Sequence, residues 1–261
     1  MSLITGSIVI YKNDISILEN AINSFLNTGL NVKLFLIDNS PSDILKSHFQ
    51  KTNISYIHNP LNPGFGASHN IAIKKSISIG SDYHVVINPD IYYSAGNLEK
   101  MKLFMDSNDT IGQLMPKVLF PDGSFQFLCK RNPTVFDLFA RGFMPAFLKN
   151  KFKIRLDKYE YRSSNFEKLI YDIPYLSGCF MFFRISVLKK VGLFDDKIFM
   201  YLEDADLTRR VLNVSRTVYY PDAYIFHHYA GMTHKKWKYK LITIKSAIIY
   251  FNKWGWFNSL F

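Results

Sequence analysis

The first ninety residues alternate short apolar runs with stretches of helical periodicity, and this alternation constrains the fold most. Apolar runs at 3–11, 32–37, 54–57 and 83–87 have the length of buried strands. Helical patterns lie between them at 15–26, 42–50 and 67–79, the first of them behind an N-cap at Asp14. Strands that alternate with helices predict an α/β fold with a Rossmann-like, mostly parallel central sheet and helices on both faces.

The second half of the chain is less regular but returns to the same pattern. Residues 122–172 mix aromatic and basic side chains and are interpreted as an insertion near the sheet edge that shapes a substrate groove. A strand is expected at 177–184, a helix at 203–212 and a strand at 218–226. With 261 residues, 48% hydrophobic and 20% charged, the chain is long enough for one large α/β domain and is not a disordered protein.

Basic residues gather at the C-terminal end of the chain. No acidic residue follows Asp222, and residues 235–261 contain six lysines together with tryptophans 237, 254 and 256. A basic, aromatic helical tail of this kind suits an anionic membrane surface. A solvated helix with packed aromatic residues, or a nucleic-acid-binding module, is the alternative. We expect no nucleic-acid partner, because the lysines and aromatics lie mainly in the tail and no nucleic-acid motif is present.

Cysteine usage and the apolar runs indicate the compartment. Cys129 and Cys179 have neither metal-ligand spacing nor the pattern of secreted disulfides, which favours a reducing environment. The chain opens with an apolar strand and lacks a basic-then-apolar leader. Its apolar stretch at 242–251 contains Lys245 and falls short of the roughly 20 residues that span a bilayer. We therefore expect a cytoplasmic protein that lies peripherally on the inner face of the plasma membrane.

Two carboxylates follow predicted strands directly. Asp38 ends the strand at 32–37, and Asp90 follows the strand at 83–87 within Asn88-Pro89-Asp90. Ligands of parallel sheets bind beyond the carboxyl ends of the strands, so we expect both side chains in one crevice. The carboxylate of Asp38 could accept a hydrogen bond from a nucleobase N–H, or it could form an Asx turn. Asp90 suits a divalent cation that bridges a diphosphate, or a plain turn.

Three further groups of residues are candidates for binding or chemistry. Asn62, Gly64, Gly66 and Asn70 surround a glycine turn that opens a helix, which suits a phosphate or serves only as a structural turn. His227-His228 ends a strand and could complete a cation site with Asp90. Three acids, Glu203, Asp204 and Asp206, begin a helix. One of them could be a general base whose pKa is raised by its charged neighbours. The alternative is a purely structural role, because the helix dipole stabilises acidic side chains in the first turn. Asp206 has the more structural character, because Arg209 and Arg210 follow at helical spacing.

The order of these motifs resembles glycosyltransferase family 2. The resemblance covers residues 3 to 234 and rests on 10–11, 37–40, 62–70, 88–90, 177–181, 192–195 and 199–207. It is closest to bacterial rhamnosyltransferases of O-antigen, lipopolysaccharide and cell-wall polysaccharide assembly. It implies a GT-A domain over 1–234, with a donor-binding half at about 1–120 and an acceptor and catalytic half at about 121–234. The basic amphipathic tail at 235–261 lies beyond it.

The resemblance also implies a role for each matching residue in an inverting, single-displacement transfer. Asp204 is the catalytic base, with Glu203 beside it. The donor-binding residues are Tyr11, Asp38, Asn62, Gly64, Gly66, Asn70, Asn88, Asp90 and Gly178. Asn88 replaces the first acid of the family's Asp-x-Asp element. Mg²⁺ or Mn²⁺ would be held by Asp90 and His228, with His227 not excluded.

The implied donor and acceptor follow from the same resemblance. The donor is a nucleotide sugar, with dTDP-β-L-rhamnose expected and a UDP-hexose or UDP-galactofuranose as alternatives. The acceptor is a hydroxyl of a glycan or of a polyprenyl-diphosphate-linked sugar.

Overall fold

The computed structural model describes residues 2–49, 51–228 and 237–257. Its strands are β1 (Leu3–Ile10), β2 (Asn31–Asp38), β3 (Ile54–His58), β4 (Tyr83–Ile87), β5 (Ile91–Tyr92), β6 (Ile111–Leu119), β7 (Cys129–Lys130), β8 (Ile170–Tyr171), β9 (Tyr175–Leu176), β10 (Phe180–Arg184) and β11 (Arg216–His227). Its helices are α1 (Ile15–Leu26), the 3₁₀ helix η1 (Lys46–Phe49), α2 (Phe65–Ser78), α3 (Asn97–Asp106), α4 (Val135–Gly142), α5 (Ala146–Lys151), α6 (Lys153–Tyr159), α7 (Ile185–Val191), α8 (Glu203–Leu212) and α9 (Trp237–Trp254).

One nine-stranded sheet runs through the described part of the chain. Its order is β3-β2-β1-β4-β10-β6-β11-β5, and β8 pairs with β11. Strands β1 to β4 are parallel neighbours, and β6 is parallel to β11. Strand β10 lies between β4 and β6 and is antiparallel to both, so β6 and β11 share the direction of β1. The sheet is therefore mostly parallel, which confirms the prediction from the alternation.

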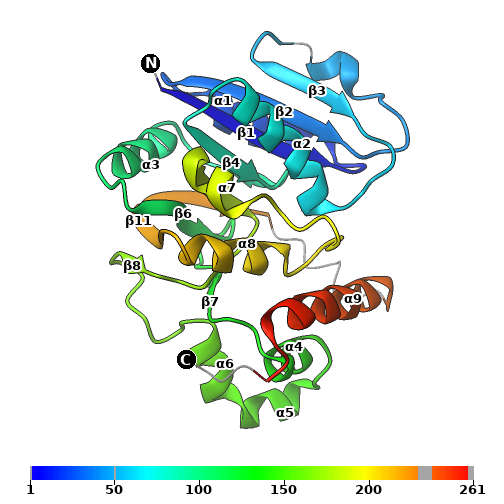
Figure 1. Ribbon diagram of the computed structural model, residues 1–261, viewed down its shortest axis with the longest axis vertical. Coiled ribbons are helices and arrows are strands. Elements are labelled where there is room, and N and C mark those ends of the chain that lie inside the picture. The colour runs from blue at the N-terminus through cyan, green and yellow to red at the C-terminus, as the bar shows by residue number, and fades with distance from the viewer. Residues whose placement is uncertain (1, 50, 229–236, 258–261) are drawn as a thin grey trace.

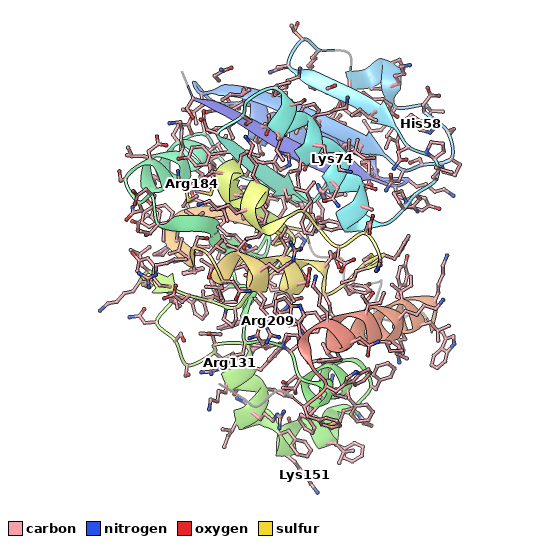
Figure 2. All side chains as sticks on the ribbon, viewed as in Figure 1. His58, Lys74, Arg131, Lys151, Arg184 and Arg209 are labelled. Atoms are coloured by element: carbon pink, nitrogen blue, oxygen red, sulfur yellow. The ribbon has the colours of Figure 1, made fainter. Side chains whose placement is uncertain are left out.

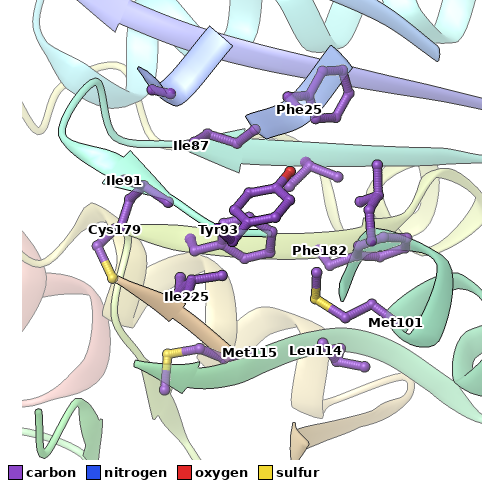
Figure 3. Packing of buried hydrophobic residues seen from close by; sticks show 14 of the residues in the cluster. Phe25, Ile87, Ile91, Tyr93, Met101, Leu114, Met115, Cys179, Phe182 and Ile225 are labelled. Carbon is purple, nitrogen blue, oxygen red and sulfur yellow. The ribbon is translucent and has the colours of Figure 1, made fainter. Parts of the chain in front are cut away.

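Helices cover both faces of this sheet (Figure 1). On one face, α1 and α3 contribute Phe25 and Met101 to a large core that also contains Phe182 of β10, and Figure 3 shows these three side chains. On the other face, α2, α7 and α8 pack their apolar residues, Leu207 of α8 among them, against β4 and β10. Each fully buried side chain of this size stabilises the fold by about 1.5–3 kcal/mol.

Helices α4, α5, α6 and α9 gather at the end of the molecule opposite β3 (Figure 1). The segment predicted as an insertion at 122–172 contains β7, α4, α5, α6 and β8. A separate two-stranded ribbon joins β7 to β9, with Lys130 opposite Tyr175. In α9, Tyr250 and Phe251 are buried in a cluster with Leu138 of α4. No helix within the described ranges combines the length and the apolar character needed to cross a bilayer.

Two expected elements differ from the structure. The helix expected at 42–50 is only the 3₁₀ helix η1. Its hydrogen bonds connect residues three apart, such as Lys46 N to Asp43 O, and only two apolar side chains, Leu45 and Phe49, reach the core. The strand expected at 177–184 begins at Phe180, and the residues before the turn at 177–179, Tyr175 and Leu176, pair with β7 outside the main sheet. The predicted halves at 1–120 and 121–234 share one sheet, and the boundary at 234/235 lies outside the described residues.

Candidate active site

Helix α8 begins with an uncommon backbone conformation. Tyr201 and Leu202 have φ angles of 72° and 70°, in the left-handed region that non-glycine residues seldom adopt. After this turn, Glu203 and Asp204 enter the first turn of α8 as buried side chains. Carboxylates in the first turn are stabilised by the helix dipole. The strained turn therefore positions both predicted catalytic residues within the protein interior.

The carboxylate of Asp204 accepts a main-chain hydrogen bond on each oxygen. Gly178 N donates to Oδ2 at 2.8 Å, and Ala205 N donates to Oδ1 at 2.9 Å. Burial raises the pKa of Asp204, whereas the charge of Lys130, the two main-chain bonds and a hydrogen bond with Tyr175 oppose that rise. These partners stabilise the charged form of the carboxylate.

Glu203 has the opposite surroundings. It is 5% exposed, and its Oε2 has no hydrogen-bond partner among the described residues. Burial, followed by the charge of Asp204, raises the pKa of Glu203 well above its ordinary value. Its own main-chain N–H is the donor that lowers the pKa of Glu203, whereas Asp204 has two main-chain donors, Tyr175 and the charge of Lys130. The surroundings of Asp204 thus favour its carboxylate form more than those of Glu203 do, and its role as the base stays a prediction.

The turn at 177–179 links this carboxylate to the end of β4. Gly178 donates to Asp204, and the carbonyl oxygen of the next residue, Cys179, accepts a hydrogen bond from Asn88 N at 2.9 Å. A Cβ on Gly178 would lie 3.2 Å from Cβ of Asp204, closer than most such contacts. Glycine therefore permits the close approach of the turn to α8, and Asp204 and the Asn88–Asp90 segment lie on its two sides.

Asp90 lies against the ring of His227. The distance from His227 Nε2 to Asp90 Oδ1 is 3.4 Å. His228 instead donates its main-chain N–H to the carbonyl oxygen of Asp90 at 3.1 Å, and its ring packs near Tyr92 at 5.0 Å between centroids. Of the two candidate histidines, His227 is thus the one whose side chain meets the predicted metal ligand.

Gln126 determines which ring nitrogen of His227 donates a hydrogen bond. Its amide nitrogen donates to the carbonyl oxygens of Leu119 and His227, at 3.3 and 2.9 Å. Its amide oxygen therefore accepts from Nδ1 of His227, at 3.0 Å. In the neutral imidazole this leaves a lone pair on Nε2, directed toward Asp90. A hydrogen bond that fixes the ring in this way is typical of metal-binding histidines.

The pair formed by Asp90 and His227 fits one divalent cation. Adjacent ligands of an octahedral ion with bonds of about 2.1 Å lie about 3 Å apart, close to the 3.4 Å between these two atoms. Within the described ranges, no group of three or more His, Cys, Asp or Glu residues could hold a metal. Phosphate and water oxygens would have to complete the coordination.

Asp38 ends β2 opposite Ile10 of the parallel strand β1, and Tyr11 directly follows Ile10. Asp38 is fully buried. Its Oδ1 accepts from Ser40 N at 2.8 Å in an Asx turn, and its Oδ2 accepts from the hydroxyl of Tyr56. Tyr11 is 49% exposed. Asp38 therefore forms the Asx turn that was the structural alternative, and its contact with a nucleobase stays a prediction.

The glycines of the turn before α2 are required by packing. Gly64 has a φ of 107°, and a Cβ there would lie 2.2 Å from the carbonyl oxygen of Phe199. A Cβ on Gly66 would lie 2.7 Å from Cβ of Phe194, and Asn70 exchanges two hydrogen bonds with the main chain of Phe194, at 2.9 and 3.0 Å. These residues hold the loop at 192–202 against α2, and their contact with a diphosphate stays a prediction.

A buried amide network fixes the chain before this turn. Asn39 donates to Asn62 Oδ1 at 3.2 Å and to Ser68 at 2.8 Å, and it accepts from Asn59 at 2.9 Å. Asn62 itself has a φ of 44°. The network connects the end of β2 with the start of α2, so hydrogen bonds join the segment predicted to bind the base to the segment predicted to bind the phosphates.

The sequence reasoning missed Lys130 and Tyr175. Lys130 is 7% exposed, and its Nζ lies 4.7 Å from the ring centroid of Tyr175 across the β7–β9 ribbon. Burial, with a contribution from Arg141, lowers the pKa of Lys130 to about 8, against the opposing effect of Asp204. The ribbon pairs residues far apart in sequence, so no local pattern marks them.

Asp206 connects α8 to α9. It is fully buried, and Arg210 NH2 lies 2.9 Å from its Oδ2. Its Oδ1 is 2.7 Å from Lys253 Nζ and accepts from Trp254 Nε1 at 2.8 Å. Arg209, labelled in Figure 2, covers the ring of Trp254 at 4.2 Å. These contacts are structural, and they attach the C-terminal helix to the helix that carries Asp204.

The fold of the chain is GT-A, the fold of several solved glycosyltransferases. The structure is similar to that of S. aureus TarS residues 1–349, with a TM-score of 0.58 and 15% identity over 94% of this chain and 65% of that one. It is also similar to GalNAc-T7 with UDP, GalNAc and Mn²⁺, with a TM-score of 0.62 and 13% identity over 87% of this chain and 44% of that one. The chain thus spans less than two thirds of both.

The chain belongs to glycosyl transferase family 2, whose profile matches residues 7–192. It is 28% identical over 219 residues to the N-acetylglucosaminyl-diphospho-decaprenol L-rhamnosyltransferase of Mycobacterium tuberculosis, covering 80% of this chain and 70% of that protein. It is 27% identical over 206 residues to the rhamnosyltransferase WbbL of Escherichia coli, covering 76% of this chain and 73% of that protein.

Proposed function

We propose that this chain is an inverting rhamnosyltransferase that moves L-rhamnose from dTDP-β-L-rhamnose to a hydroxyl of a glycan or polyprenyl-diphosphate-linked acceptor in bacterial surface polysaccharide synthesis. One observation carries the proposal: the turn at 177–179 joins the buried carboxylate of Asp204 to the strand end that bears Asp90. A proton acceptor and a diphosphate-binding end are thereby held beside one sheet edge. The names of the two curated relatives support the choice of sugar and acceptor.

The chemistry assigned to the chain is a single displacement. The acceptor oxygen forms a bond to the anomeric carbon while the bond from that carbon to the phosphate oxygen breaks, and the electron pair leaves with dTDP. Asp204 takes the hydroxyl proton as the new bond forms, because a neutral hydroxyl is a poor nucleophile. Burial and the charge of Asp204 raise the pKa of Glu203, which favours its protonated form and leaves Asp204 as the group that accepts.

A divalent cation, Mg²⁺ or Mn²⁺, is part of the proposal. Asp90 and His227 would hold it, and Gln126 orients the imidazole of His227. When bound, such an ion would neutralise charge on the departing diphosphate. Asn88 places no second carboxylate at this strand end, so these two residues would be the protein's main contribution to binding the ion.

The proposed acceptor locates the protein at a membrane. A polyprenyl-diphosphate-linked sugar is held in a bilayer, so we propose a cytoplasmic protein that is peripheral on the inner face of the plasma membrane. The basic tail at 235–261 would contact anionic lipid there. We propose no nucleic-acid partner.

A thermal-shift panel of dTDP-, UDP- and GDP-sugars, with and without Mn²⁺, tests the donor assignment. We expect dTDP-rhamnose to give the largest shift, and the shift to grow with Mn²⁺. Stabilisation by a UDP-hexose or UDP-galactofuranose alone would replace the proposed donor. If no nucleotide sugar stabilises the protein, the proposed transfer reaction fails as well.

A further inference from the structure

Helix α9 exposes large apolar side chains in a single row. The row consists of Trp237, Leu241, Ile244 and Ile248, which are 67%, 44%, 40% and 43% exposed. Their spacing of four, three and four residues places them on one face of the helix. The side chains that anchor α9 to the protein, Tyr250 and Phe251, are buried. The exposed row is therefore not needed to hold α9 in place.

Lysines flank this row on both sides. At about 100° per residue, Lys238 and Lys245 lie on one side of the row and Lys240 on the other. Lys238 and Lys245 are exposed, and Lys240 lies partly buried over the ring of Phe143 at 5.3 Å. A helix that lies in a lipid headgroup layer has this arrangement of an apolar stripe bordered by basic residues.

The helices α4–α6 expose a second set of apolar side chains beside α9. The set consists of Val135, Phe139, Phe147, Phe152 and Ile154, which are 42%, 54%, 70%, 37% and 88% exposed. The contact between Lys240 and Phe143, and the apolar cluster around Leu138, join α4 to α9. Figure 1 shows the four helices at one end of the molecule, and Figure 2 shows Lys151 projecting from that end.

Almost all of the net charge of the protein belongs to these two segments. Residues 135–159 contain six basic and two acidic residues, and residues 235–261 contain six lysines and no acid. The remaining chain has 20 basic and 19 acidic residues, against 32 and 21 in total. The apolar side chains and the positive charge thus coincide, as anionic lipid requires. A second copy of the chain would place like charges against each other.

We propose that α4–α6 and the exposed row of α9 form one composite docking face for an anionic lipid bilayer, in which the insertion takes part as well as the tail. The inference rests on the proposed function, because a membrane-borne acceptor gives the face its use. Trp254 and Lys253 of α9 bind Asp206 of α8. The docked helix is therefore attached to the helix that carries Asp204, which would hold the catalytic helix in a fixed position relative to the bilayer.

Co-sedimentation with phosphatidylglycerol/phosphatidylcholine vesicles tests the composite face on the full chain. One variant, Phe147→Ser with Ile154→Ser, changes only the insertion, and another, Leu241→Ser with Ile244→Ser, changes only α9. The matched control, Ile44→Ser with Leu103→Ser, removes apolar residues that are 73% and 69% exposed outside these helices. We expect each face variant to lose at least about tenfold in partition coefficient, and the control to equal the wild type.

Several results would overturn the proposal. One is an insertion variant that binds vesicles as strongly as the wild type does. Another is a wild-type protein that binds pure phosphatidylcholine vesicles as strongly as vesicles with phosphatidylglycerol. A third is a wild-type protein that binds no vesicles but forms a dimer, which the insertion variant converts to a monomer. Turnover with a water-soluble acceptor analogue measures the proposed function separately. A wild-type protein that binds vesicles through both segments but transfers no sugar would refute the proposed function and support the docking face.

Discussion

Replacing Glu203 with glutamine separates the roles of the two acids at the start of α8. Glu203 is buried beside Asp204, and its Oε2 has no partner among the described residues. Glutamine has nearly the shape of the protonated side chain. We expect Glu203→Gln to keep transfer activity within a few-fold of the wild type, because the carboxylate of Asp204 retains its donors.

The same substitution should raise the free energy of unfolding at neutral pH. Unfolded Glu203 ionises near the ordinary pKa of 4.5, and folding raises that pKa. A raised pKa of the folded state gives a contribution that is complete below 4.5 and is lost as the pH rises toward the folded value. The advantage of Glu203→Gln should therefore grow as the pH rises above 4.5, at a limiting rate of about 1.4 kcal/mol per pH unit, and level off where folded Glu203 ionises.

Urea unfolding followed by tryptophan fluorescence across this pH range measures the effect. Glu19→Gln on the exposed face of α1 is the matched control, and its difference from the wild type should stay nearly constant with pH. The reasoning is refuted if Glu203→Gln unfolds more easily than the wild type at pH 7. It is equally refuted if the variant loses transfer activity, since Glu203 would then carry the reactive charge.

Three further substitutions test other parts of the site. Lys130→Met removes a charge that lowers the pKa of Asp204, so the acid limb of the kcat–pH profile should move to higher pH. Lys130→Arg should return the limb to its wild-type position. A limb that does not move in Lys130→Met contradicts this role of Lys130. His227→Gln should raise the Mn²⁺ concentration for half-maximal activity about 10–100-fold, and His228→Gln much less; the reverse order would exchange their roles. Gly64→Ala meets a φ of 107° and a carbonyl oxygen at 2.2 Å, and should lower the free energy of thermal unfolding by about 3 kcal/mol or more. Gly123→Ala, at a φ of 84° in open space, should lower it by only about 1–2 kcal/mol, and similar losses would contradict the packing argument.

Local patterns were sufficient to predict that Asp38 and Asp90 stand at strand ends, whereas their contact with a ligand stays a prediction. Asp38 and Asp90 follow continuous apolar runs, and parallel strands bring such ends to one sheet edge. The acids at 203–206 begin a helix, as their pattern predicted, and the spacing of Arg210 indicated the structural role seen for Asp206. These predictions depend on short-range periodicity, which the sequence displays directly.

Contacts between distant segments could not be predicted in the same way. Lys130 reaches the site only because β7 pairs with β9. The orientation of the His227 ring toward Asp90 depends on Gln126, which approaches from another part of the chain. Gly64 and Asn70 have the residue types of a phosphate turn, yet their neighbours Phe199 and Phe194 belong to a loop more than a hundred residues later.

Asp204→Asn gives the most direct test of the central claim. Asparagine keeps the size of the side chain and removes its ability to accept the acceptor proton. With dTDP-rhamnose, a polyprenyl-diphosphate-linked acceptor and Mn²⁺, we expect kcat to fall by about 10²–10⁴-fold while the donor Kd from calorimetry stays unchanged. Turnover within tenfold of the wild type, with donor binding intact, would contradict Asp204 as the base and with it the proposed mechanism.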